Sequence, residues 1–198
     1  MTTAIEETWP DDPNIPVLFL GEWCRFYSRR ERWSKMNADV LPYHWDDRKK
    51  LYNDYQYLNN LYEIMLMAMK EQLNEIHRVD HSLRYWRILI GPWLGFFLQM
   101  LFDRWSMLKH AFEKHEISGC SIMENDKNRL IPHDMSDFLS VYVDDNWNEM
   151  IYGQLLEEYW KDHIDIEYVI KNIDQVENTY RNNGLIRSSL SSLKQSFL

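Results

Sequence analysis

The chain has 198 residues, of which 45% are hydrophobic and 15% are aromatic, so it can form a packed core and is not a disordered chain. Its formal net charge of −9 excludes the strongly basic surface that is typical of nucleic-acid-binding proteins, and we expect no nucleic-acid partner. The two cysteines, Cys24 and Cys120, form no CxxC pair, which favours free thiols in a reducing compartment and no metal site.

The first predicted element is a buried strand at about residues 15–21. Its sequence, IPVLFLG, is apolar on both faces and too short for a stable helix, as is typical of parallel strands. In open α/β sheets, ligands collect at the carboxyl ends of the strands. Glu22 and Trp23 follow this strand, so they could hydrogen-bond to a sugar and stack on it. The alternative is a packed tryptophan beside a surface glutamate.

Residues 41–50, LPYHWDDRKK, surround a predicted helix start with one imidazole, two carboxylates and three cations. His44 could act as a general acid or base. Asp46 or Asp47 could bind a metal but is more simply the residue that caps the helix. Arg48 either contacts an anionic substrate or belongs to a solvated face.

Two long helices are predicted next, at about residues 47–78 and 82–114. The first has apolar residues at steps of 3 and 4, which is the period of a helix face. These residues are Leu51, Tyr55, Leu58, Tyr62, Met65, Met69, Leu73 and Ile76. Ser82 can cap the second helix, and Pro92 should kink it. Because the link between them is short, we expect the two helices to pack as an antiparallel pair.

A second strand is predicted at about residues 118–123, and further helices at about 133–180. If the two strands are neighbours in one sheet, the long insert between them makes them parallel. We therefore expect a helix-rich α/β fold, with a small parallel sheet flanked by two long antiparallel helices.

The start of the second long helix, HSLRYWRILIGPW, carries His81, Arg84 and Arg87 on neighbouring faces. The two arginines could form a buried fork for a phosphate or a carboxylate. The alternative is a set of ion pairs with acids of the facing helix, such as Glu63 or Glu71. The apolar stretch at 88–102 is shorter than a spanning helix, which favours a core helix over a peripheral membrane contact.

The stretches LFLGEWCRFYSR, LPYHWDDR and HSLRYWRxxxGPW together resemble the transferases encoded in O-antigen and other surface-polysaccharide gene clusters. The resemblance covers about residues 2–105. The resemblance implies a cytoplasmic enzyme. If the enzyme associates with the membrane, it would do so at the inner face. Such an enzyme would use a nucleotide-activated sugar donor and a glycan or lipid-linked acceptor, without a covalently bound cofactor. The implied fold is the amino-terminal half of a two-domain glycosyltransferase.

Members of that family are much longer than 198 residues. We therefore expect residues 1–198 to form one amino-terminal domain on the acceptor side, either as a fragment or as a natural short form. A carboxyl-terminal domain or a second copy would complete it, and the isolated chain would be inactive. The expected acid–base residues are Glu22 and His44. The expected substrate-binding residues are Trp23, Trp45, Arg48, His81, Arg84 and Arg87. The alternative is a non-catalytic helical module that dimerises or binds a partner protein.

Overall fold

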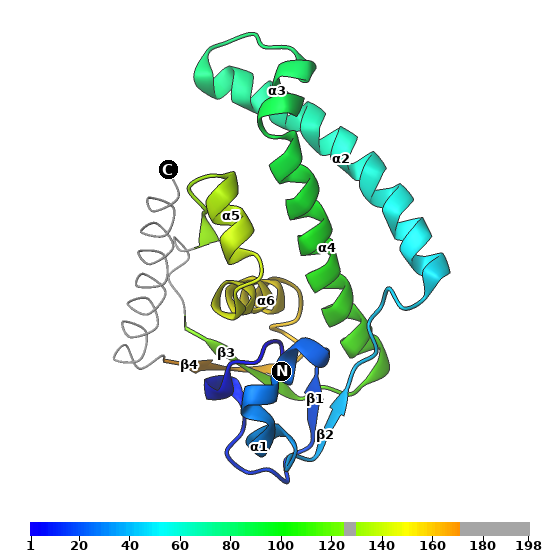
Figure 1. Ribbon diagram of the computed structural model, residues 1–198, viewed down its shortest axis with the longest axis vertical. Coiled ribbons are helices and arrows are strands. Elements are labelled where there is room, and N and C mark those ends of the chain that lie inside the picture. The colour runs from blue at the N-terminus through cyan, green and yellow to red at the C-terminus, as the bar shows by residue number, and fades with distance from the viewer. Residues whose placement is uncertain (125–129, 171–198) are drawn as a thin grey trace, which may run out of the picture.

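The structure, a computed structural model, describes residues 1–124 and 130–170 (Figure 1). Within these residues it contains six α-helices and four strands. The helices are α1 (Arg30–Trp33), α2 (Arg48–His77), α3 (Leu83–Leu89), α4 (Gly91–Lys114), α5 (Met135–Val141) and α6 (Asp145–Tyr159). The strands are β1 (Val17–Phe19), β2 (Ala38–Val40), β3 (Gly119–Met123) and β4 (Asp165–Val169). The chain is therefore helix-rich α/β, as predicted.

The strands form two separate parallel sheets, each of two strands. β1 pairs with β2, with Val17 opposite Ala38, and β3 pairs with β4, with Gly119 opposite Asp165. The prediction that the strands at 15–21 and 118–123 are neighbours in one sheet is therefore wrong. The reason is that β1 and β3 each pair with another short strand, β2 or β4, that contains no continuous apolar run. Such strands are hard to predict from the sequence.

The β4 strand corrects the prediction that residues 133–180 contain only helices. α5 and α6 lie where helices were expected, but residues 165–169 are extended and bond to β3. Their sequence, DIEYV, alternates charged and apolar side chains, which suits a strand with one open face. Residues 171–180 of the predicted helical region lie outside the described residues.

Local signals set the ends of the long helices correctly. The carboxylate of Asp47 accepts hydrogen bonds from the backbone N–H groups of Lys49 and Lys50 and so caps α2. Ser82 caps α3 in the same way, through the N–H of Tyr85. The kinked helix predicted over 82–114 is instead two helices, because Pro92 lies in the first turn of α4, where its missing N–H leaves no bond unmade.

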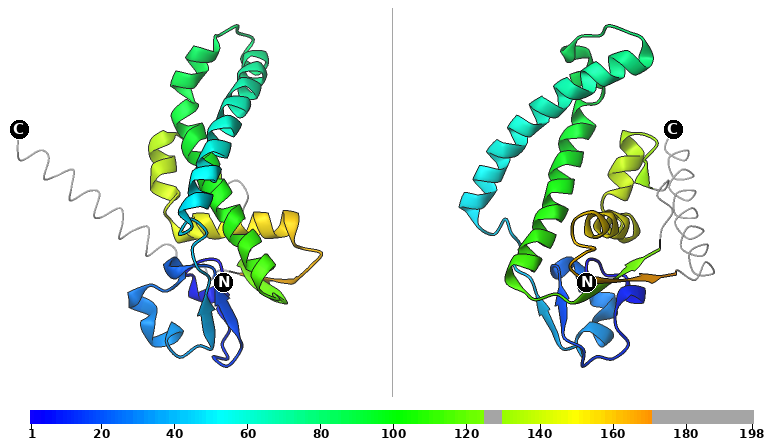
Figure 2. Two further views of the ribbon diagram at one scale, coloured as in Figure 1. Left: turned by 90° about the vertical axis from the view of Figure 1, so that its right-hand side faces the viewer. Right: turned by 180° about the vertical axis from the view of Figure 1, so that it is seen from behind.

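α2 runs antiparallel to α3 and α4, and this helical arm projects away from the two sheets (Figures 1 and 2). The packing face of α2 is only partly covered: Leu58 is buried, whereas Met65 is exposed. The close approach of α4 depends on Gly91, where a Cβ atom would lie 2.5 Å from the hydroxyl of Tyr62. A Cβ atom at Gly95 would be in ordinary contact with the same ring, at 3.8 Å.

None of the helices in the described residues has the length and apolar character that a membrane span requires.

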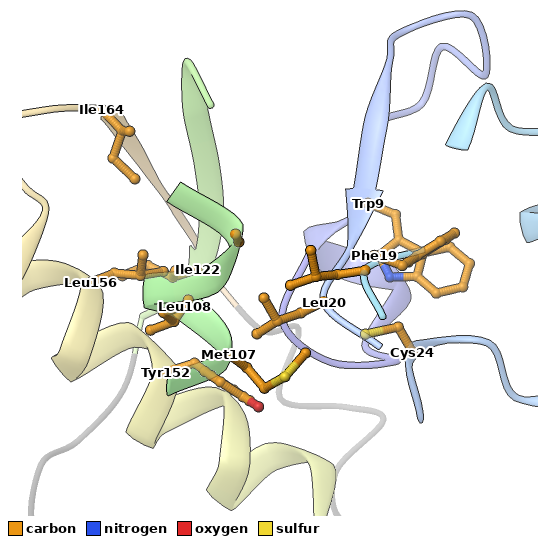
Figure 3. Packing of buried hydrophobic residues seen from close by; sticks show 12 residues of the cluster. Trp9, Phe19, Leu20, Cys24, Met107, Leu108, Ile122, Tyr152, Leu156 and Ile164 are labelled. Carbon is orange, nitrogen blue, oxygen red and sulfur yellow. The ribbon is translucent and has the colours of Figure 1, made fainter. Parts of the chain in front are cut away.

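The main core lies between the two sheets, α4 and α6 (Figure 3). β1 contributes Phe19, α4 contributes Met107 and Leu108, and α6 contributes Tyr152 and Leu156. A second, smaller cluster joins α4 to α5 and α6 around Phe138 and Trp147. α4 and α6 therefore belong to both clusters, and together they fix the edge of the β1–β2 sheet where a cavity opens.

Candidate functional site

A cavity of about 670 Å³ opens where β1 and β2 end. Because the two strands are parallel, the segments that follow them leave the sheet at the same edge. α4 and α6 supply the rest of the wall. The chain segments that line the cavity include Gly21–Trp23 after β1 and Leu41–Tyr43 after β2, with Asp103 and Arg104 from α4 and Asp145, Asn148 and Tyr152 from α6.

Trp23 and Tyr43 form an aromatic corner of this cavity. Their ring centroids lie 6.2 Å apart, and the rings are nearly perpendicular. Trp23 is held by its indole N–H, which donates to the carbonyl of Thr2 at 3.0 Å. Its ring folds back across Gly21, where any Cβ atom would overlap it, so the glycine is required for this orientation. A flat sugar face can pack in such a corner.

Asp103 is the centre of a buried polar network beside the aromatic corner. Its Oδ1 atom accepts from the Tyr43 hydroxyl at 2.8 Å and lies 3.0 Å from Nε2 of His44. Its Oδ2 atom accepts from the guanidinium of Arg104. Because an ionised carboxylate only accepts, Nε2 of His44 carries the proton.

The network determines which of these groups are charged. Burial favours the neutral form of Asp103, but the bonds from His44, Arg104 and Tyr43 together hold its pKa below the ordinary value. The phenol behaves oppositely: burial, and then the bond to Asp103, raise the pKa of Tyr43. Tyr43 therefore stays a neutral donor beside a carboxylate that stays ionised.

α6 holds Arg104 from the other side. The Nε atom of Arg104 donates to Oδ1 of Asn148 at 3.0 Å. The amide nitrogen of Asn148 in turn donates to the carbonyls of Tyr142 and Asp144, both at 2.9 Å. The guanidinium is therefore fixed in the cavity wall by two helices that are distant in sequence.

Further carboxylates line the cavity. Glu22 is exposed and forms an ion pair with Arg25 at 2.5 Å. Burial raises the pKa of Asp145, and the charge of Arg29 opposes this rise. Exposed carboxylates near aromatic rings can accept hydrogen bonds from the hydroxyls of a sugar.

Comparison with known proteins identifies the family of the chain. Residues 1–198 match the model of a protein family described as LIC12162 family transferase. The chain belongs to this family. Neither a curated protein nor a solved structure matches it.

This LIC12162 family transferase brings only some of the predicted site residues together. Glu22 and Trp23 line the cavity. His44 is buried behind Tyr43 and does not line it. Trp45 points the other way, with its indole N–H bonded to Asp54 at 2.9 Å, and lines a separate cavity between α2 and α4. Arg48 is exposed in the first turn of α2.

The predicted arginine fork does not exist. Arg84 is exposed, and Arg87 is half-exposed and makes two bonds of 2.6 Å to the carboxylate of Glu63. The expectation that both arginines are largely buried is therefore wrong, and the alternative of an ion pair with Glu63 is confirmed for Arg87. The ring of His81 lies beside that of Tyr85, with centroids 4.0 Å apart and the planes tilted by 32°. All three lie at the α3 end of the arm, away from the β1–β2 edge (Figure 1).

The sequence pattern missed Asp103, Arg104 and Asn148 as site residues. One signal was present for Asp103 and Arg104: they follow twelve nearly apolar residues of α4, and a charged pair in such a helix is costly to bury without partners. Asn148 gave no such signal, since it sits among polar residues near the start of α6. In the part of the chain that the structure describes, no group of three or more His, Cys, Asp or Glu side chains could hold a metal ion.

Proposed function

We propose that this transferase carries the acceptor side of a sugar-transfer reaction in surface-polysaccharide synthesis, with the acceptor sugar in the cavity where β1 and β2 end. The observation that supports this most is the combination, at one sheet edge, of the Trp23–Tyr43 corner with exposed carboxylates. Aromatic faces and carboxylates are the groups that bind the two faces of a sugar, its C–H groups and its hydroxyls.

The chemistry needs a group that takes the proton from the acceptor. In the proposed reaction, an acceptor hydroxyl oxygen attacks the anomeric carbon of a nucleotide-activated sugar. The bond from that carbon to the phosphate oxygen breaks, and the nucleotide leaves with the bonding electrons. Glu22 receives the hydroxyl proton, because it lines the cavity and is exposed.

His44 takes a positioning role in this proposal. Its side chain is 1% exposed and its Nε2–H is used by Asp103, so it has no direct route to the substrate. It acts through Asp103, which holds Tyr43 and Arg104 at the cavity wall.

The proposal can be tested by sugar binding and sugar transfer. Neutral hexoses should quench or shift the tryptophan fluorescence of the full chain, and Trp23→Ala should weaken binding by about three- to tenfold, because an aromatic contact contributes about 0.5–1.5 kcal/mol. Glu22→Gln should leave binding in place. Transfer from a radiolabelled nucleotide sugar would show that the chain is active by itself, against the expectation from the resemblance, and Glu22→Gln should lower this transfer by at least about a hundredfold.

A matched control is Glu63→Gln, which removes an exposed carboxylate on the arm instead of one in the cavity. This variant should keep both binding and transfer. Sugar binding that is unchanged by Trp23→Ala, or transfer that is unchanged by Glu22→Gln, would contradict the proposal.

A second candidate function is protein interaction through the helical arm. It is favoured by large apolar side chains that remain exposed there, namely Tyr55, Ile64, Ile88, Leu89 and Phe96. Sizing of the chain against Ile88→Asp and Leu89→Asp tests it: a dimer that these changes dissociate supports the module, and a monomer in all forms contradicts it.

A further inference from the structure

We propose that Arg104 binds an oxyanion of the substrate in the cavity, either a phosphate of the donor or the carboxylate of an acidic sugar. This inference rests on the proposed function, because it names a chemical group of the substrate that the same cavity would receive. The sequence predicted that Arg84 and Arg87 bind such an anion, but both lie on the arm, away from the cavity. We assign this role to Arg104 instead.

The first argument is that two hydrogen bonds fix the orientation of the Arg104 guanidinium. Nη1 donates to Asp103 and Nε donates to Asn148, so two of the three nitrogens of the guanidinium fix its plane. Asp103 cannot turn away, because its other oxygen is bonded to Tyr43 and His44. Such an arrangement removes the conformational entropy that an arginine normally loses when it binds an anion.

The second argument is that the guanidinium remains open on the cavity side. The Arg104 side chain is 23% exposed, whereas that of its partner Asp103 is 7% exposed. Nη2 makes no hydrogen bond to any group in residues 1–124 or 130–170, and it is not among the buried unbonded atoms. Its N–H groups are therefore donors without an acceptor at the wall of a cavity that is large enough for a sugar or a phosphate ester.

The third argument concerns the charges around the site. The carboxylate of Asp103 is already shared with Tyr43 and His44, Glu22 is paired with Arg25, and Arg29 lies near Asp145. Of the four acids that line the cavity, Glu22 and Asp145 have a cation other than Arg104 beside them, Asp46 has no ion pair among the described residues, and Asp103 is the partner of Arg104 itself. Asp103 therefore balances part of the charge of Arg104, and the attraction for an anion depends mainly on the free Nη2 donors. Arginine is suited to phosphate and carboxylate because its planar donors match two oxygens at once.

The test measures binding of four probes to the full chain by calorimetry: pyrophosphate, uridine diphosphate, glucuronate and glucose. We expect Arg104→Gln to weaken at least one anionic probe by about tenfold or more, since a hydrogen bond to a charged group contributes about that factor. Glucose binding should change by less than about threefold. Binding of the phosphate compounds alone indicates the donor, and binding of glucuronate alone indicates an acidic sugar.

The matched control is Arg87→Gln, which removes an arginine that is also paired with a carboxylate but lies on the arm. It should leave all four affinities unchanged. If Arg104→Gln does not fold because Asp103 is left without its cation, the double variant Asp103→Asn/Arg104→Gln replaces the ion pair by two neutral amides. Loss of anion binding in this variant supports the inference, and retained binding overturns it.

The outcomes separate this inference from the proposed function. Glucose binding in the cavity without any binding of the three anionic probes overturns the role of Arg104 and leaves the sugar site standing. Anion binding that depends on Arg104, in a chain that binds no neutral sugar and transfers none, supports the oxyanion site and contradicts sugar transfer.

Discussion

The Nε2 atom of His44 lies 3.0 Å from Oδ1 of Asp103, and the two residues are 59 positions apart in the chain. Their side chains are only 1% and 7% exposed. The other ring nitrogen of His44, Nδ1, has no hydrogen-bond partner among the described residues. It lies 4.0 Å from a carboxylate oxygen of Asp54. The contact ties the segment after β2 to the middle of α4, and both elements line the cavity.

Asp103→Asn should destabilise the chain by about 3 kcal/mol, because it leaves a partly buried guanidinium without its counter-charge. Chemical denaturation followed by circular dichroism measures this loss. The comparison is Glu63→Gln, which breaks the exposed ion pair with Arg87 and should leave the midpoint almost unchanged, because solvent screens such pairs. Equal effects of the two changes would mean that the Asp103 network contributes no more than a surface pair.

Glu149→Gln should stabilise the chain at neutral pH. Burial raises the pKa of Glu149, against the opposing bonds from the hydroxyls of Thr2 and Thr3 at 2.6 and 2.7 Å. A raised folded-state pKa means that the contribution of this carboxyl is fully present below the ordinary value of 4.5 and is lost as the pH rises through the folded value.

The glutamine mimics the neutral acid, so Tm at pH 7 should rise by at least about 2 °C, and the difference from the parent chain should shrink as the pH falls towards 4. Thermal melts at a series of pH values check this. A gain that is the same at pH 4 and pH 7 would show that ionisation of Glu149 is not its cause.

Gly91→Ala and Gly95→Ala should change stability in opposite directions. The new methyl group at position 91 would lie 2.5 Å from the Tyr62 hydroxyl, so either the Tyr62 side chain or the two helices must shift, at a cost of about 1–3 kcal/mol. At position 95 the nearest atom of that ring is 3.8 Å away, and alanine should stabilise the helix interior by about 0.5–1 kcal/mol. Urea midpoints of the two variants give the comparison, and a loss at both positions would mean that the helices are packed more tightly along their whole contact.

Both cysteines should resist thiol reagents in the native chain. Burial raises the pKa of Cys24 to about 11, so at pH 8 only about a thousandth of it is thiolate. Burial also raises the pKa of Cys120. Reaction with a chromogenic disulfide should be at least about tenfold slower in the native chain than in guanidinium, where both thiols react. Fast reaction of one native thiol would reveal an exposed, activated cysteine.

The sequence by itself determined the features that depend on neighbours within a few residues. The cap at Asp46 or Asp47, the cap at Ser82 and the apolar period of α2 are all local, because a helix end is set by hydrogen bonds within its own first turn. The first strand and the glycine after it were also recognisable, and they indicated one edge of the cavity. For the same reason, the sequence placed Glu22 and Trp23 at this edge, and both line the cavity.

Only the tertiary structure decided which distant groups meet. β2 and β4 are short and partly charged, and their pairing with β1 and β3 depends on contacts far apart in the chain. Arg84, Arg87 and Arg104 are equally cationic in the sequence. α3 places the first two at the far end of an arm, where solvent screens them, whereas α4 and α6 converge to hold the third beside the cavity. An arginine becomes a binding group through the partners that fix and desolvate it. Arg104 is held by the adjacent Asp103 and by Asn148, 44 residues after it, and Asp103 is held in turn by Tyr43, 60 residues before Asp103.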